Sequence, residues 1–205
     1  MQGHHLILGQ IDDFITGEPL IETHDERYRQ RIAHLLAEQK GYPKEEITPR
    51  KELLITAGEK RAIIKIDYVI SVAGRAGMII KYGPGSLVTR QRPALALARL
   101  LTGYMVPVVV VTNGQNADIL NGSNGKLMAV GLDLIPSRQE LSVIIESHDL
   151  ELISKERAVL EARIAYTFEV DGACPCDNTI QRSAVGSQRS AVSRRQSAVG
   201  RRQIN

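Results

Sequence analysis

The size and make-up of the chain already restrict the class of protein. It has 205 residues, 43% of them hydrophobic and 24% charged, so it can bury a core without disulfides or a structural metal. The formal net charge of +3 hides an asymmetry, because residues 179–205 carry six arginines and no acid, whereas the rest is mildly acidic. No apolar run approaches the roughly 18 residues of a membrane span, and there is no signal-peptide pattern, so we expect a cytoplasmic protein that does not contact a membrane.

The first half of the chain predicts a helix followed by three strands. Residues 1–22 are interpreted as a leader segment that lies on the domain. From Thr23 or Asp25, either of which can cap a helix, apolar residues at helical spacing predict an amphipathic helix that ends at Gly41. Three segments rich in β-branched residues and separated by glycine turns then predict an antiparallel meander: 53–55, 62–70 and 78–80.

The second half predicts a helix, a buried strand, a hairpin and two more helices. Pro93 is expected to open a helix over 94–101. The fully apolar run 106–111 is typical of a strand buried on both faces. The remaining elements are a hairpin around 121–125, a helix that begins with a capping box at Ser137 and a helix over 154–168. This order predicts an α/β (α+β) fold: an αβββαβ core with a mixed central sheet, an extra β-hairpin and C-terminal helices.

Domain boundaries follow from the changes in composition. The expected division is a leader over 1–22, a core domain over 23–150, a C-terminal helix with the segment Cys174-Pro175-Cys176 over 151–178, and a low-complexity tail rich in Arg, Ser and Gln over 179–205. In the tail Ser-Ala-Val recurs every seven residues. Two interpretations stay open: an arginine-rich arm that contacts phosphates, or a low-complexity extension without a role.

Four segments carry a resemblance to a known family: Asp25-Glu26-Arg27-Tyr28-Arg29, Ile66-Asp67-Tyr68-Val69, Met78-Ile79-Ile80-Lys81-Tyr82, and the strand 106–111 followed by Thr112-Asn113-Gly114. In this order they resemble the PD-(D/E)XK nuclease fold, and more narrowly the N-terminal nuclease-like domain of the restriction subunit of type I restriction enzymes. The resemblance covers about residues 20–135. It implies a restriction-endonuclease-like core and phosphodiester hydrolysis with Mg²⁺.

The resemblance assigns the catalytic positions. Asp67 takes the place of the first carboxylate, Lys81 that of the lysine, and Glu26 that of an auxiliary acid on the first helix. Ile79 stands where the family carries the second acid, so the catalytic set is incomplete. A displaced carboxylate, Glu52 or Glu26, is the candidate replacement, which makes Asp67 and Glu52 the candidate metal ligands. Mg²⁺ is therefore the expected cofactor if the site is active, and no cofactor is expected otherwise.

Each of these residues also has a simpler interpretation. Asp67 can be a strand-end acid paired with a lysine, and Glu26 can form an ordinary surface pair on its helix. The family's Gln and Tyr on the next helix find no counterpart, since the expected register places Ala96 and Leu100 there. The candidate nucleic-acid contacts precede that helix, where a helix N-terminus and guanidinium groups suit phosphates: Thr89, Arg90 and Arg92.

Three functions stay open on the sequence. The first is a nuclease-fold protein with an incomplete PD-(D/E)XK motif that binds nucleic acid, with DNA as the expected partner, or is accessory to restriction. The second is an active Mg²⁺-dependent DNA endonuclease that uses a displaced carboxylate. The third is a non-catalytic module that forms a homodimer through its C-terminal helix. No nucleotide cofactor is expected, because Gly83-Pro84-Gly85-Ser86 lacks the pattern of an NTP-binding loop.

Overall fold

The chain begins with a hairpin and a capped helix. The computed structural model describes residues 6–148, 151–172 and 181–183. Strands β1 (Gly9–Asp12) and β2 (Pro19–Glu22) pair antiparallel and lead into α1 (His24–His34) and the π-helical turn η1 (Leu35–Gln39). The Thr23 side chain accepts the N–H of Glu26 at 3.1 Å, so the helix predicted from Thr23 is confirmed with its cap.

The predicted meander is confirmed, with strands longer than their apolar centres. After the short turn η2 (Lys44–Glu46) come β3 (Ile47–Ala57), β4 (Lys60–Val72) and β5 (Arg75–Tyr82), each antiparallel to the one before. Gly58 and Gly74, with φ of 65° and 75°, supply the left-handed backbone of the two turns. Strand β6 (Val108–Thr112) runs parallel to β5 and is buried along its whole length, as its apolar run predicts.

The mixed sheet has the order β3-β4-β5-β6-β7-β8. Strands β7 (Ala117–Asn121) and β8 (Leu127–Val130) form the predicted hairpin, and β9 (Gln181–Ser183) pairs with residues 61–63 of β4. The turn η3 (Leu132–Leu134) leads into α3 (Arg138–Ser147), which starts with the predicted capping box. The chain continues through α4 (Lys155–Tyr166) and the π-helical turn η4 (Thr167–Asp171). The α/β fold class predicted from the order of elements is therefore confirmed.

The helix expected to open at Pro93 starts earlier. Helix α2 (Val88–Leu101) contains Pro93, so that prediction was wrong by about one and a half turns. Proline is favoured at the first position of a helix, which is why the sequence predicts a helix start there. The turn ahead of it is held by other contacts, because Arg90 N–H donates to the Leu87 carbonyl at 2.9 Å and the Arg90 guanidinium packs against Gly83.

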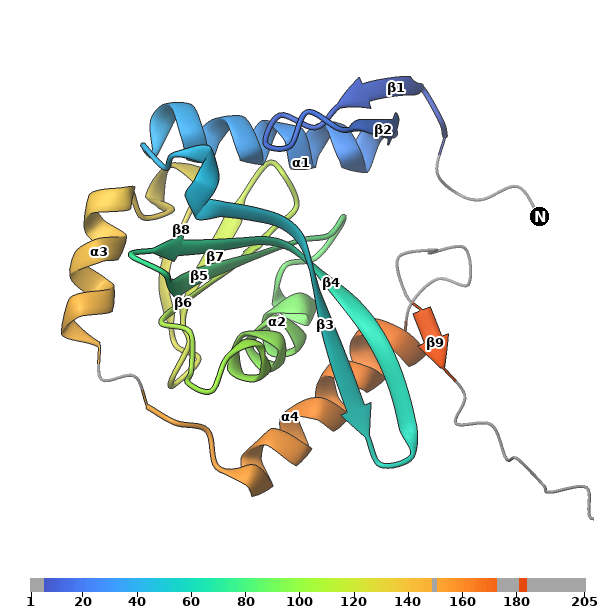
Figure 1. Cartoon of the computed structure of the whole chain (residues 1–205), viewed down its shortest axis with the longest axis vertical. Coiled ribbons are helices and arrows are strands. Elements are labelled where there is room, and N and C mark those ends of the chain that lie inside the picture. The colour runs from blue at the N-terminus through green and yellow to red at the C-terminus, as the bar shows by residue number, and fades with distance from the viewer. Residues whose placement is uncertain (1–5, 149–150, 173–180, 184–205) are drawn as a thin grey trace, which may run out of the picture.

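The sheet separates two apolar cores (Figure 1). Helices α2 and α4 cover one face, and α1 and α3 cover the other. Along β4, Ile64 and Ile66 face the α2/α4 core, whereas Tyr68 and Ile70 face the α1/α3 core. Because alternate residues of a regular strand share one face, the alternation must change phase around Asp67.

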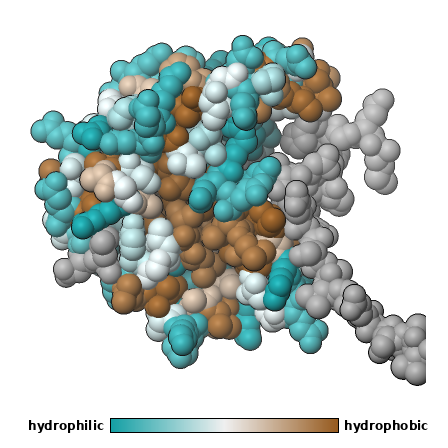
Figure 2. All heavy atoms as spheres, in the orientation of Figure 1, coloured by the Kyte–Doolittle hydropathy of each residue, from teal (hydrophilic) through white to brown (hydrophobic). Residues whose placement is uncertain are grey.

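The surface carries apolar side chains on the layer of α2 and α4. Figure 2 shows them gathered over α2 in the middle of one face, with polar side chains around them. Helix α4 buries Ala162, Ala165 and Tyr166 in the core, while Val159 and Leu160 are about half exposed. The homodimer predicted through this helix stays a prediction. Within 6–148 and 151–172, none of the helices has the length and hydropathy needed to cross a membrane.

The expected Cys-Pro-Cys segment and the repeat tail from residue 184 onward lie outside the described residues.

Candidate functional site

The candidate site lies where β4 and β5 separate. Their ladder ends at the pair Tyr68 and Ile80, and the next two residues are Asp67 and Lys81. Tyr82 N–H donates to Asp67 Oδ2 at 2.8 Å, and Lys81 Nζ donates to the Lys65 carbonyl at 2.9 Å. Buried backbone groups need partners, so these two side chains satisfy groups that the ladder no longer pairs. Both residues therefore have a structural task at the split in the sheet.

Asp67 is held by two cations as well as by the backbone. Its Oδ1 lies 2.6 Å from Arg29 Nε, and its Oδ2 lies 3.8 Å from Lys81 Nζ. The residue is only 8% exposed. Burial alone would raise the pKa of Asp67, but the charges of Lys81 and Arg29 and the bonds it accepts outweigh burial and hold the pKa below its ordinary value. Asp67 is thus a carboxylate whose oxygens are already engaged.

Besides Asp67, Lys81 contacts a second acid, Glu169. Its Oε2 lies 3.1 Å from Lys81 Nζ, and it comes from η4, more than eighty residues further along the chain. Burial lowers the pKa of Lys81, but Glu169 and Asp67 outweigh burial and raise it, so the ammonium is kept charged. No sequence pattern predicts this contact, because Glu169 follows a helix that no motif connects to β5.

The other predicted acids are placed differently. Glu26 accepts a hydrogen bond from Gln30 at 2.8 Å and lies 3.6 Å from Arg29 Nη1, so Arg29 links it to Asp67. Glu52 is exposed on β3, with its Oε1 3.6 Å from Lys65 Nζ. The structure therefore brings Asp67 and Lys81 together, connects Glu26 through an arginine, and does not place Glu52 beside Asp67.

The residues at this site do not fit a Mg²⁺ ion. Mg²⁺ prefers near-octahedral oxygen coordination, usually with one or two free carboxylates. Here the Asp67 oxygens are taken by Arg29, Lys81 and the Tyr82 amide, and Ile79 is fully buried in the α2/α4 core. In the part of the chain that the structure describes, no cluster of three or more His, Cys, Asp or Glu residues can hold a metal ion.

The three predicted nucleic-acid contacts divide between two sides of α2. Thr89 Oγ1 donates to the Ser86 carbonyl at 3.2 Å, and Arg90 Nη2 donates to the Pro84 carbonyl at 3.0 Å, so both face the turn after β5. Arg92 instead lies 2.6 Å from the buried carboxylate of Glu161. Residues two apart on an α-helix point about 200° apart, which explains the division.

The Thr-Asn-Gly segment at the end of β6 forms a turn against which α1 packs. Asn113 Oδ1 accepts the N–H groups of Gln115 and Asn116 at 3.0 and 2.9 Å. Gly114 has φ of 83° and packs so closely on the ring of Tyr28 that a Cβ there would lie 2.3 Å from a ring carbon. The turn thus positions the helix that carries Arg29, whose guanidinium holds Asp67.

Comparison with protein families matches residues 24–136 to the type I restriction enzyme R protein N terminus (HSDR_N). The chain belongs to this family. Searches of curated proteins and of solved structures found no match. The resemblance inferred from the four segments is therefore confirmed, and the matched region runs from α1 to just before α3.

The family region leaves out two acids that contact it. Glu161 and Glu169 lie on α4 and η4, beyond the residues matched to the restriction enzyme family, yet they bind Arg92 and Lys81 within it. Sequence reasoning also missed Gln91, which donates to the buried Asp118 at 2.7 Å. With α2 expected to begin only at residue 93, Gln91 falls outside the predicted helix, so its contact with Asp118 was not predicted.

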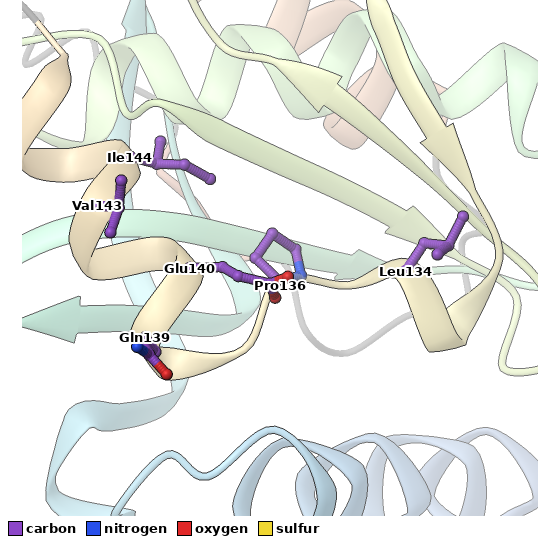
Figure 3. Close-up of a pocket in the computed structure, with 6 residues that line it drawn as sticks. All are labelled: Leu134, Pro136, Gln139, Glu140, Val143 and Ile144. Atoms are coloured by element: carbon purple, nitrogen blue, oxygen red, sulfur yellow. The ribbon is translucent and has the colours of Figure 1, made fainter.

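A pocket lies away from this site. Its volume is about 530 Å³, and none of the predicted catalytic, metal or nucleic-acid residues lines it. Figure 3 shows the lining side chains between η3 and α3: Leu134, Pro136, Gln139, Glu140, Val143 and Ile144. Two of these residues lie at the very end of the family region and the other four lie beyond it, and none of them is a nuclease-like position.

Proposed function

We propose that this chain is a nuclease-fold module of the type I restriction enzyme family that binds DNA without hydrolysing it. The observation that carries the proposal is the closed charge network around Asp67. One carboxylate oxygen is bonded by Arg29, and the other by the Tyr82 amide with Lys81 nearby. A metal ion would have to displace these donors, and Ile79 supplies no ligand in exchange.

The network also disfavours a phosphate at the lysine. Lys81 is 14% exposed at its side chain and lies between Glu169 and Asp67, at 3.1 and 3.8 Å. Both carboxylates would repel a phosphodiester that approached the ammonium, and both would lose a buried partner if Lys81 turned toward it. The nuclease-like positions therefore act as a structural ion-pair network in this chain.

Two features support DNA as the partner. The matched family is the N terminus of the type I restriction enzyme R protein, and restriction enzymes act on DNA. Helix α2, next to the nuclease-like positions, carries three arginines and no acidic residue, although the chain without its tail is mildly acidic. Thr89 and Arg90 lie at the start of this helix and are at least partly exposed. A helix N-terminus with a guanidinium group suits a backbone phosphate.

The absence of hydrolysis is tested by nicking of supercoiled plasmid. Wild type and Asp67→Ala are incubated with Mg²⁺ or Mn²⁺, at equal protein concentrations. Neither protein should increase nicking above a protein-free control. Metal-dependent nicking by wild type that disappears in Asp67→Ala would refute the proposal, because it would show that the ion pairs open to admit a metal.

DNA binding is tested by fluorescence anisotropy of a labelled duplex over a salt series. Wild type should bind more weakly as salt rises, and Arg90→Ala should weaken binding and lower the salt slope by about one unit. Arg75→Ala is the matched control, because Arg75 is exposed at the opposite end of β5 from Lys81. No binding by wild type at low salt would sink the DNA assignment.

A further inference from the structure

The junction of α2 and α4 contains one fully buried acid shared by three arginines. Glu161 is 0% exposed. Its Oε1 lies 2.8 Å from Arg99 Nη1 and 2.7 Å from Arg157 Nε, and its Oε2 lies 2.6 Å from Arg92 Nη1. Burial would raise the pKa of Glu161, but the bonds from Arg92 and Arg157 lead the effects that outweigh it, and the pKa is held below its ordinary value. The carboxylate is therefore ionised and carries one negative charge against three positive ones.

Arg99 is the arginine that balances this acid inside the protein. It is 5% exposed, and its other guanidinium nitrogens donate to the carbonyls of Gly122 and Ser123 at 3.2 and 2.8 Å. Each of its three guanidinium nitrogens is thus bonded within the fold. The charges of Arg92 and Arg157 remain in excess, since a single carboxylate cannot neutralise three guanidinium groups.

Arg92 and Arg157 keep a large part of their side chains exposed. Their side chains are 38% and 50% exposed, and each is tied to Glu161 through one nitrogen. For the other nitrogens the structure gives no acceptor in residues 6–148 and 151–172. The acid nearest in sequence, Glu156, is bound to its own helix cap at Ser154. Two partly exposed arginine side chains therefore have guanidinium nitrogens without an acceptor in this part of the chain.

The shared carboxylate also brings these two groups near each other. Arg92 binds one oxygen of the Glu161 side chain and Arg157 binds the other, so both guanidinium groups lie next to the same carboxylate. Arg92 comes from α2 and Arg157 from α4, which pack against each other (Figure 1). Planar guanidinium groups bind phosphate with paired N–H donors, and a site held in place by the core loses less entropy on binding.

We propose that Arg92 and Arg157 form a binding site for a backbone phosphate of DNA. The site extends the DNA-binding surface from the start of α2 to α4, which lies outside the family region, and the inference rests on the proposed function for the identity of the ligand. Glu161 is a positioning residue that orients both arginines. The bound group is a phosphodiester monoanion, and free phosphate offers the same chemistry.

The main experiment measures duplex binding by anisotropy between 50 and 200 mM salt. Arg92→Gln and Arg157→Gln should each lower the salt slope by about 0.9, so the advantage of wild type over the variant falls about 3.5-fold across this range. Arg163→Gln is the matched control, since Arg163 is an exposed arginine on the same helix and has no contact with Glu161. Arg157→Lys keeps the charge but loses the paired donors, and should fall between wild type and Arg157→Gln.

A second measurement separates the source of the phosphate and checks folding. Titration with inorganic phosphate, followed by NMR of the arginine Nε–H signals, should shift Arg157 only weakly at concentrations where the duplex shifts it fully. Variants that keep the wild-type amide spectrum are folded and can be compared. Saturation by free phosphate together with unchanged duplex binding in both Gln variants would overturn the DNA assignment of this site.

The two proposals fail in different ways. If wild type binds the duplex and only Arg90→Ala weakens it, the DNA-binding function stands and the Arg92–Arg157 site is refuted. If both Gln variants behave like Arg163→Gln, the loss reflects general charge and the site is also refuted. If wild type binds no duplex at any salt concentration, the proposed function itself is refuted, and with it the ligand of this site.

Discussion

Replacing Asp67 by Asn should destabilise the protein. The change keeps the shape of the side chain and removes its charge. If Asp67 closes the split between β4 and β5, the change leaves Arg29 and Lys81 with a weaker partner in a mostly buried site. A residue kept for metal chemistry behaves in the opposite way, because replacing it with a neutral one commonly makes a protein more stable.

The size of the expected loss of stability depends on which acidic partners Arg29 and Lys81 retain. Removing one partner of a buried ion pair costs about 3 to 5 kcal/mol. Arg29 retains Glu26 at 3.6 Å, and Lys81 retains Glu169 at 3.1 Å, so neither cation is left alone. The lower end, about 3 kcal/mol, is therefore expected. With an m-value of about 2 kcal/mol/M, the urea midpoint should fall by about 1.5 M.

Urea unfolding at pH 7, followed by circular dichroism, measures this difference. Glu52→Gln is the control, because Glu52 is the other predicted metal ligand and its exposed pair with Lys65 should contribute less than about 1 kcal/mol. An Asp67→Asn midpoint equal to or above that of wild type would refute the structural role. In a Lys81→Met background the cost of Asp67→Asn should shrink, since one of the two cations that need Asp67 is gone.

The remaining predictions concern pH and two other positions. Because the pKa of Asp67 is held low, Asp67 contributes to stability above the unfolded pKa of about 3.9, and this contribution is lost as pH falls below it. Because the pKa of Lys81 is raised, Lys81 contributes to stability below the unfolded pKa of about 10.4, and this contribution is lost as pH rises further. Urea midpoints measured across pH test both contributions. Glu161→Gln should cost about 4 kcal/mol by urea unfolding, because a buried arginine loses its counter-charge. Gly114→Ala should cost at least about 1 kcal/mol, because alanine is strained at a φ of 83° and its Cβ would meet Tyr28.

Matched variants make two of these results interpretable. Gly103→Ala tests the glycine argument, since a Cβ there meets nothing within 4 Å and the backbone is outside the left-handed region, so its midpoint should stay at the wild-type value. Glu156→Gln removes an exposed acid from the same helix as Glu161 and should change stability little. A Glu161→Gln midpoint as close to wild type as that of Glu156→Gln would contradict the role of the buried carboxylate.

Local patterns predicted the elements because each has a short-range cause. The meander follows from β-branched runs between glycines, and the caps at Thr23 and Ser137 follow from side chains that bond nearby N–H groups. The juxtaposition of Asp67 and Lys81 also follows from neighbouring strands in register. Such features depend on residues that are close in sequence or joined by one tight turn.

Contacts between distant elements could not be predicted in this way. Glu169 meets Lys81, and Glu161 meets Arg92, only because α4 and η4 pack on the face of the sheet that carries α2. Nothing in the spacing of these residues encodes that packing. The start of α2 was missed for a related reason, since the turn ahead of Pro93 depends on Arg90 packing against Gly83 rather than on helix propensity.

The two ion-pair centres differ in the sign of their excess charge. Around Asp67 and Lys81, three acids (Asp67, Glu26 and Glu169) face two cations (Arg29 and Lys81), so the excess charge is negative and repels a phosphate, while the donors bonded to Asp67 occupy the oxygens that a metal would need. Around Glu161 a single acid holds three arginines, and the excess is positive. An anion gains nothing at the first centre and finds unused donors at the second. This difference in charge is why we propose the phosphate site at the junction of α2 and α4 and not at the nuclease-like strand ends.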